Sequence, residues 1–182
     1  MQPDQAHLDN LRNYCPIVYS TGYNIHAFGL EKLHPFDASK YRRVMEDLQQ
    51  SGTIRENIDH VYAPKIPSRE FLQNVMSKWY LFTLNYSIQL FRCIELPVFF
   101  LPAWILRMRL QDPMMRATQG SVDAACIARR TGWAINVSGG YHHAHREGGG
   151  GFCIYPDITF ITHYMQQWFS YKRILIIDLD AH

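Results

Sequence analysis

Three potential metal ligands alternate with apolar residues at the carboxyl end of the sequence. Asp178, Asp180 and His182 recur at every second position, directly after the apolar run 174–177. In an extended backbone, side chains two residues apart point to the same side. Two carboxylates and an imidazole placed in this way would form one face of a cation site. Taken alone, the motif is equally compatible with a polar turn that follows a strand.

A second group of ionisable residues follows a predicted strand at 133–137. The adjacent His142 and His143 lie there between two glycine-rich stretches. Imidazole titrates near neutral pH, so paired histidines suit proton transfer. Glycines let the backbone approach a ligand closely. A histidine pair by itself is more often a surface feature, but beside the Asp178 motif it predicts a reactive site.

Both groups depend on the elements that hold them. Residues 174–177 predict a strand that is buried on both faces, as in a parallel sheet. A predicted helix, 158–170, capped by Asp157, connects this strand to 133–137. Strand, loop, helix and strand make a βαβ unit with parallel strands, whose carboxyl ends share one edge. Ligands of open α/β sheets bind at that edge, so we expect the two groups to meet there.

Other segments give the rest of the predicted scaffold. Residues 79–92 fit neither a helical nor a strand period, and we assign no element to them. The remaining expectations are a strand at 16–20, a helix at 38–50 capped by Asp37, a helix at 69–78 capped by Ser68, and a helix at 120–130 ended by Gly132.

Composition limits the class of protein. With 182 residues, 47% apolar and 14% aromatic, the sequence predicts one globular unit, residues 1–182. Its 18 Lys and Arg and 16 Asp and Glu are scattered, which gives no basis for a nucleic-acid surface. No uncharged stretch reaches the roughly 18 residues of a membrane span. Four separated cysteines and a polar amino terminus favour an intracellular protein.

The two reactive segments resemble a known family. GGYHHA at 139–144, GGGFC at 149–153 and DLDAH at 178–182 are similar to the active-site blocks of the zinc-dependent histone deacetylases. PIVYS, YNI, GLEKLHPFD and GWAINV resemble the class IV subtype of that family, the histone deacetylase 11 type. The resemblance implies an α/β fold of the arginase and deacetylase type, an open parallel sheet flanked by helices. It also implies hydrolysis of acetyl or longer acyl groups on protein lysines.

The resemblance further implies roles for individual residues. Asp180 and His182 match two of the family's three zinc ligands. His143 matches the general base that takes a proton from the attacking water, and His142 matches its companion. Asp178 resembles the carboxylate that holds His142.

Substrate access and partners also follow from the resemblance. Gly151 and Phe152 match the narrow channel that admits an acylated lysine side chain. The backbone of 178–182 resembles the family's structural potassium site. The implied partners are acylated proteins such as histones, together with co-repressor proteins, and the implied locations are the nucleus and cytoplasm.

Departures from the family pattern set the remaining expectations. The family's third zinc ligand and its transition-state tyrosine lie downstream of the matching region, so the chain corresponds to the amino-terminal half of a domain, truncated after a strand that ends at His182. We therefore expect weak metal binding and little or no activity from residues 1–182 alone. Residues 80–93 look like an insertion, and His145 is interpreted as a loop residue. Two alternatives stay open: a catalytically inert binding protein, and an arginase-like metallohydrolase, which the paired histidines disfavour.

Overall fold

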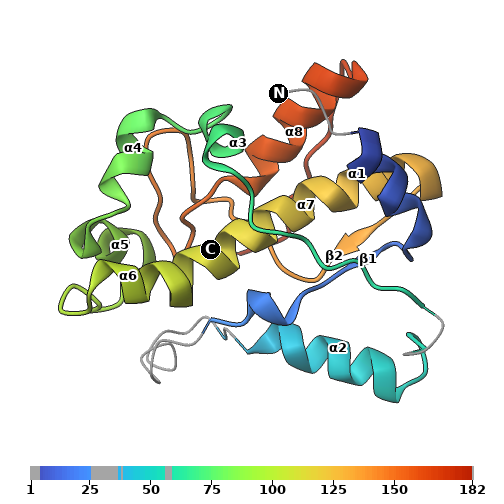
Figure 1. Cartoon of the computed structure of the whole chain (residues 1–182), viewed down its shortest axis with the longest axis horizontal. Helices are drawn as coiled ribbons and strands as arrows, with labels where there is room; N and C mark the ends of the chain where they lie inside the picture. The colour runs from blue at the N-terminus through green and yellow to red at the C-terminus, as the bar shows by residue number, and fades with distance from the viewer. Residues whose placement is uncertain (1–4, 26–36, 38, 56–58, 182) are drawn as a thin grey trace.

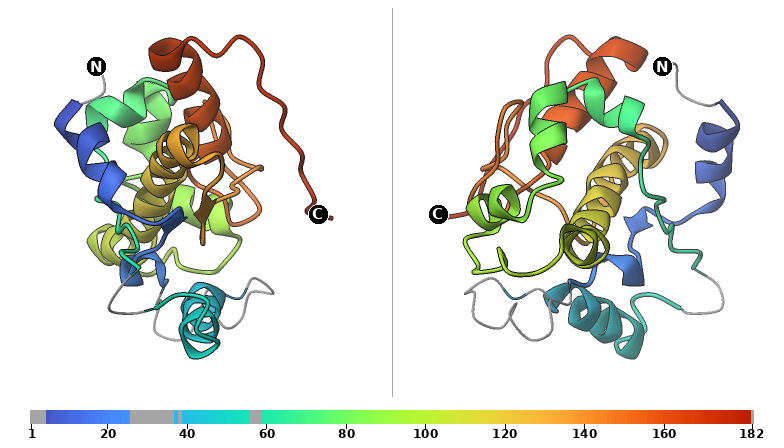
Figure 2. Two further views of the ribbon diagram at one scale, coloured as in Figure 1. Left: turned by 90° about the vertical axis from the view of Figure 1, so that its right-hand side faces the viewer. Right: turned by 60° about the vertical axis from the view of Figure 1, so that its left-hand side comes forward.

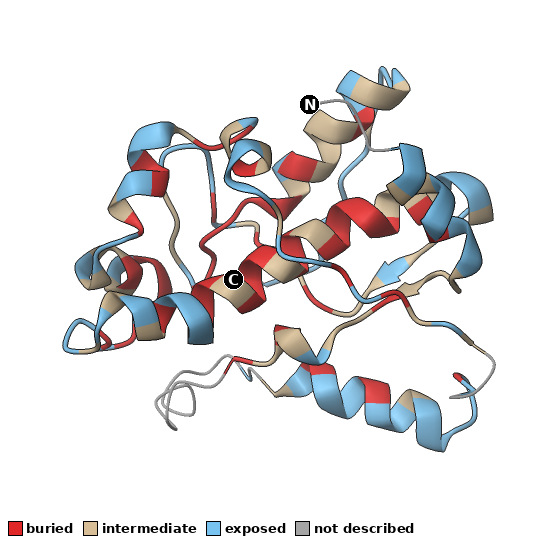
Figure 3. Ribbon diagram, in the orientation of Figure 1, coloured by how far each residue is buried: buried red, intermediate tan, exposed pale blue. Residues whose placement is uncertain are grey.

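The protein is built around one long buried helix. The computed structural model describes residues 5–25, 37, 39–55 and 59–181. Helix α7 (Asp112–Thr131) crosses the centre and contacts α8 (Asp157–Phe169) and both strands (Figure 1). Buried residues follow one another along most of its length (Figure 3). The sequence predicted the second half of this helix and its end, where Gly132 has φ +87° and donates its amide to the carbonyl of Ala128.

The first half of α7 was missed because it is less regularly patterned. It follows a short helix, α6 (Ala103–Leu106), and a π-helical turn, η4 (Arg107–Gln111), which widen the helix locally. Pro113 lies in the first turn of α7, directly after the π-helical turn. Fully buried Met114 and Ala117 then join the main core.

The described sheet is small and parallel. Strand β1 (Ile17–Val18) pairs with β2 (Ile135–Asn136), with Ile17 opposite Ile135. Tyr62 forms a parallel bridge with Val18 on the other side of β1. The chain therefore has the predicted α/β class.

Strand β2 is shorter and more exposed than the sequence predicted. The expected buried strand 133–137 reduces to two residues, and Ile135 has 53% of its surface exposed. The physical reason is that α7 covers β2 from one side, whereas no described element packs over Ile135.

The expected terminal strand is also absent from the described residues. Residues 170–181 leave α8 as an extended segment without strand pairing (Figure 2). Leu175 and Ile177 are 84% and 71% exposed, so the prediction of a doubly buried strand is wrong for this structure. A strand needs a hydrogen-bonding neighbour, and no described strand lies beside this segment. The parallel pair is consequently β1 and β2 rather than the two strands of the predicted βαβ unit.

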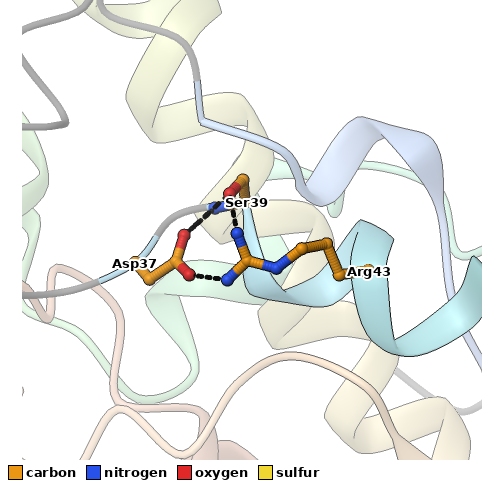
Figure 4. Close-up of polar contacts among 3 residues, drawn as sticks. All are labelled: Asp37, Ser39 and Arg43. Atoms are coloured by element: carbon orange, nitrogen blue, oxygen red, sulfur yellow. Dashed lines mark hydrogen bonds and ion pairs between the residues drawn. The ribbon is translucent and has the colours of Figure 1, made fainter. Parts of the chain in front are cut away.

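A polar cluster begins helix α2 (Lys40–Gln50), which starts two residues later than predicted. The Asp37 carboxylate accepts hydrogen bonds from the Ser39 amide (3.0 Å) and hydroxyl (2.7 Å), and it also pairs with Arg43 (Figure 4). The N-cap residue of α2 is Ser39, so the prediction that Asp37 caps this helix is wrong; Asp37 instead binds the cap residue and Arg43 from outside the helix. Ala38 and most of the GLEKLHPFD motif lie outside the described residues.

Short helices fill the region that the sequence left unassigned. Helix α3 (Arg69–Gln73) is capped by Ser68, whose hydroxyl accepts the Phe71 amide at 3.2 Å, but it ends earlier than predicted. Helices α4 (Lys78–Thr83) and α5 (Ser87–Ile94) follow it. Each is too short to show a clear helical period, which explains why the pattern was ambiguous.

The amino-terminal segment packs on the end of α7. It comprises α1 (Gln5–Asn10) and the 3-10 turn η1 (Leu11–Asn13), and a second 3-10 turn, η2 (Thr21–Tyr23), follows β1. Leu11, Val18 and Ile127 share a small core beside the main one. All four cysteines are free thiols, and no described helix is long and apolar enough to cross a membrane.

Candidate functional site

The structure brings the histidine loop and the terminal segment together through one hydrogen bond. The Nδ1 atom of His142 lies 2.7 Å from a carboxylate oxygen of Asp178. This bond is the main reason that the pKa of Asp178 lies below its ordinary value, and the backbone amide of Asp180, which donates to the other oxygen at 3.0 Å, adds to it. The side chain of His142 is mostly buried, whereas that of Asp178 is about half exposed. The two segments meet without the strand pairing that the sequence predicted.

His143 lies beside His142 and against a glycine. The two imidazole centroids are 4.0 Å apart, with the rings inclined by 60°. A Cβ atom on Gly151 would lie 2.4 Å from Cδ2 of His143, and Gly151 has φ +52°. A larger residue at 151 would therefore displace the ring of His143. His143 itself is exposed, which leaves it open to solvent and small ligands.

The backbone before the histidines is held by a residue that sequence reasoning did not place in the site. The buried carboxylate of Asp157 accepts hydrogen bonds from the amides of Gly140 (2.8 Å) and Tyr141 (2.7 Å) and from the Ser121 hydroxyl (2.6 Å). The sequence assigned Asp157 only as a helix cap. An aspartate at the start of a helix is explained by capping alone, so the sequence offered no indication of its contact with a loop sixteen residues earlier.

The glycine-rich stretch after the histidines is anchored by α5. The amide of Phe152 donates to the carbonyl of Cys93 at 3.0 Å, and the amide of Gly151 donates to Glu95 at 3.1 Å. Phe152 has φ +64°, unusual for a bulky residue, and its side chain is 2% exposed. The channel role assigned to Gly151 and Phe152 stays a prediction.

Helix α4 also contacts the glycine-rich stretch. The Tyr80 hydroxyl donates to the carbonyl of Ile154 at 3.2 Å. A Cβ atom on Gly149 would lie 2.7 Å from that hydroxyl, so the glycine permits the approach. The region that looked like an insertion, 80–93, thus supports the loop directly. Only the three-dimensional contacts reveal this, because neither helix carries a sequence motif.

The prediction of a zinc site rests on the types of the residues at 180 and 182, not on an arrangement of ligands in the described structure. Asp180 offers a carboxylate that suits zinc, and His182 would add an imidazole. His182 lies outside the described residues. Among the residues that the structure does describe, no three His, Cys, Asp or Glu side chains gather in a metal-binding arrangement. Asp178 is engaged by His142, and Asp180 is the described residue that matches a zinc ligand of the family.

His145 takes no part in this arrangement. It is exposed and forms a tight turn with Gly148, whose amide and carbonyl bond to the backbone of His145. Its Nδ1 accepts the amide of Glu147 at 3.3 Å. These local contacts agree with its interpretation as a loop residue.

Comparison with known proteins identifies the family. The histone deacetylase domain matches residues 34–182, which include both histidines, the glycine-rich stretch and the terminal aspartates. The chain therefore belongs to the histone deacetylase domain family. The arginase and deacetylase type of α/β fold follows from this membership.

Individual relatives show how much of the family domain is present. Histone deacetylase 2 of Arabidopsis thaliana is 40% identical over 167 residues, which cover 91% of this chain and 43% of the relative. An uncharacterized protein of Picosynechococcus is 33% identical over 172 residues, 92% of this chain and 52% of that protein. The acetoin utilization protein AcuC of Bacillus subtilis is 47% identical over 49 residues, 27% of this chain. The chain spans about half the length of the first two relatives.

Proposed function

We propose that the chain carries the proton-transfer half of a zinc-dependent lysine deacylase site of the class IV type. The contact between His142 and Asp178 carries this proposal, because it joins two segments that are 36 residues apart and that both match the family. The substrates would be acetyl or longer acyl groups on protein lysines, including histones. Class IV assignment is supported by the PIVYS, YNI and GWAINV segments.

The contact between His142 and Asp178 supports one tautomer for His142, the proposed companion histidine. Because the pKa of Asp178 is lowered, its carboxylate is ionised at neutral pH and accepts the proton on Nδ1 of His142. Nε2 of His142 is then free to accept a hydrogen bond. The adjacent His143, exposed to solvent, would take the proton from the attacking water and return it to the departing lysine amine.

Zinc would be held by Asp180 and His182 in this proposal. When bound, the ion would polarise the acyl carbonyl and lower the pKa of the attacking water. As a further element of the site, we propose a potassium ion on the backbone of 178–182. Histone substrates and co-repressors would place the protein in the nucleus and cytoplasm.

The test is a hydrolysis assay with a matched histidine control. Acetyl-lysine and long-chain acyl-lysine peptides are offered to this chain and to any longer natural form that contains it, with and without a zinc chelator. His143→Ala should lower kcat by roughly 10²- to 10⁴-fold, the usual contribution of a general base. His145→Ala, which alters a neighbouring exposed histidine, should leave kcat unchanged.

The outcomes separate the proposal from its alternative. Chelator-sensitive hydrolysis that depends on His143 and not on His145 supports a deacylase. Absence of hydrolysis from every natural form would overturn the proposal and favour a catalytically inert binding protein.

A further inference from the structure

Asp157 ends a buried chain of hydrogen bonds that crosses the molecule. The hydroxyl of Tyr23 donates to Oδ1 of Asn136 at 2.8 Å, and Nδ2 of Asn136 donates to the Ser121 hydroxyl at 2.9 Å. Ser121 in turn donates to Asp157 at 2.6 Å. Four elements, η2, β2, α7 and α8, each supply one member (Figure 1). All donors therefore point in one direction, toward the carboxylate.

The hydrogen-bond chain is buried at Tyr23, Ser121 and Asp157 and partly buried at Asn136. Tyr23 and Asp157 are each 1% exposed, and Ser121 is 5% exposed. The second amide hydrogen of Asn136 is donated to the carbonyl of Ala117 at 3.0 Å. Burial raises the pKa of Tyr23, so its hydroxyl stays protonated and remains a donor at neutral pH. In such a low-dielectric setting, each satisfied bond restricts the next one.

Two glycines leave space for the side chains of this hydrogen-bond chain. A Cβ atom on Gly120 would lie 2.1 Å from the Tyr23 hydroxyl oxygen. A Cβ atom on Gly139 would lie 2.4 Å from Asp157 Oδ2 and 2.5 Å from Ser121 Oγ. Gly120 therefore lets the backbone lie close to the Tyr23 hydroxyl, and Gly139 lets it lie close to the Asp157 carboxylate and the Ser121 hydroxyl.

The hydrogen-bond chain acts on the histidine loop through the backbone amides that Asp157 binds. Asp157 holds the amides of Gly140 and Tyr141, the two residues directly before His142. Tyr141 is also buried, and the amide of His142 donates to the carbonyl of Gly140 at 2.9 Å. The position from which His142 reaches Asp178 is therefore fixed on its amino-terminal side by Asp157.

We propose that Asp157 is a positioning residue for the histidine pair, and that the buried chain from Tyr23 holds it in place. Asp157 touches neither imidazole and would act through the main chain of 140–141. This inference rests on the proposed function only for its catalytic consequence, because the positioning itself can be measured without substrate.

The experiment compares amide exchange in three variants of this chain by NMR. Asp157→Asn keeps the size of the side chain but removes one acceptor oxygen, so one backbone donor in the loop loses its partner. We expect exchange of the amide that loses its acceptor, that of Gly140 or Tyr141, to accelerate about tenfold or more, as for loss of a hydrogen bond to a charged group. The Nδ1 proton signal of His142 should broaden or disappear. Tyr23→Phe, at the far end, should produce the same changes to a smaller degree.

A matched control tests general destabilisation. Gln111 is a buried amide that accepts the Tyr155 hydroxyl at 3.0 Å and donates to the carbonyl of Leu84 at 2.9 Å, and neither bond involves residues 140–141. Gln111→Met should lower overall stability without selective exchange at 140–141. Should Asp157→Asn fail to fold, Ser121→Ala removes one donor to the same carboxylate and should show the loop effect alone.

Two outcomes are decisive. Equal exchange at 140–141 in the Asp157, Tyr23 and Gln111 variants would overturn the positioning role. In a hydrolytically active natural form, Asp157→Asn should lower kcat about 100-fold with little change in KM, as for a misplaced catalytic group. Local exchange thus tests the positioning role, and wild-type hydrolysis tests the proposed function, so either can fail alone.

Discussion

The glycines around the histidine loop show how single residues shape the candidate site. Gly139 has φ +99°, and a side chain there would collide with both Asp157 and Ser121. Gly132, at the end of α7, has a similar φ of +87°, but a side chain there would meet nothing within 4 Å. Both positions have a positive φ, but they differ in their surroundings.

This difference yields a prediction for alanine substitution. Gly132→Ala should reduce the free energy of unfolding by about 1 to 2 kcal/mol, the cost of a left-handed conformation. Gly139→Ala should reduce it by roughly 1 to 3 kcal/mol more, because the methyl group also overpacks the buried chain. Urea denaturation of both variants measures the difference. Equal losses would show that Asp157 and Ser121 move aside freely.

At the scale of elements, two helices are held by polar contacts at their ends. Helix α1 has no buried residue of its own, yet His7 lies 2.9 Å from the buried carboxylate of Asp123 on α7. Helix α2 starts at the Asp37, Ser39 and Arg43 cluster, which is exposed. The strength of the contact between His7 and Asp123 depends on its burial. The strength of the Asp37 cluster depends on the ionisation of Asp37.

Loss of the buried contact should release the amino-terminal segment. In His7→Ala, the Asp123 carboxylate still accepts a hydrogen bond from the side-chain amide of Gln119 at 2.9 Å, but it loses its hydrogen bond with the imidazole. We expect destabilisation of about 1 to 3 kcal/mol, the cost of a buried polar group with an unmade bond. Hydrogen exchange over residues 5–13 measures it. Gln5→Ala, which removes an exposed bond to Asp9, is the control and should have little effect.

The start of α2 should respond to acid. The Ser39 hydroxyl, followed by its amide, lowers the pKa of Asp37 below its ordinary value of 3.8. The stabilisation is therefore present above pH 3.8 and is lost as the pH falls through the lower, folded-state pKa. Carbon-13 NMR titration should show a higher pKa for Asp37 in Ser39→Ala. Arg42→Ala, whose partner is Glu46, should not change it.

The whole molecule exposes an apolar segment where the sequence predicted a strand. Residues 174–177 and Leu179 extend from α8 with little cover. Extended apolar segments without a partner strand pair readily with other chains. The hydrogen bond between His142 and Asp178 joins this segment to the loop.

Self-association of the isolated chain should follow from that exposure. Light scattering over a concentration series should show association that Ile177→Lys suppresses. Ile88, on α5, is 52% exposed, and Ile88→Lys should have less effect. An equal response of both variants would assign the association to general surface hydrophobicity.

The sequence by itself determined the chemistry of the site. The histidine pair, the Asp178 motif and the flanking glycines are consecutive residues, so their types and spacing could be read directly. The α/β class and the end of α7 at Gly132 were also predictable, because hydrophobic period and glycine caps are local signals.

Only the tertiary structure decided which residues hold that chemistry in place. Asp157, Ser121, Asn136 and Tyr23 lie far apart along the chain, and none carries a motif that reveals its partner. The exposure of residues 174–177 was equally hidden, because an apolar run shows that burial is favourable but not whether another strand lies beside it. Hydrogen bonding between distant segments depends on where the backbone places them, and local patterns do not contain that information.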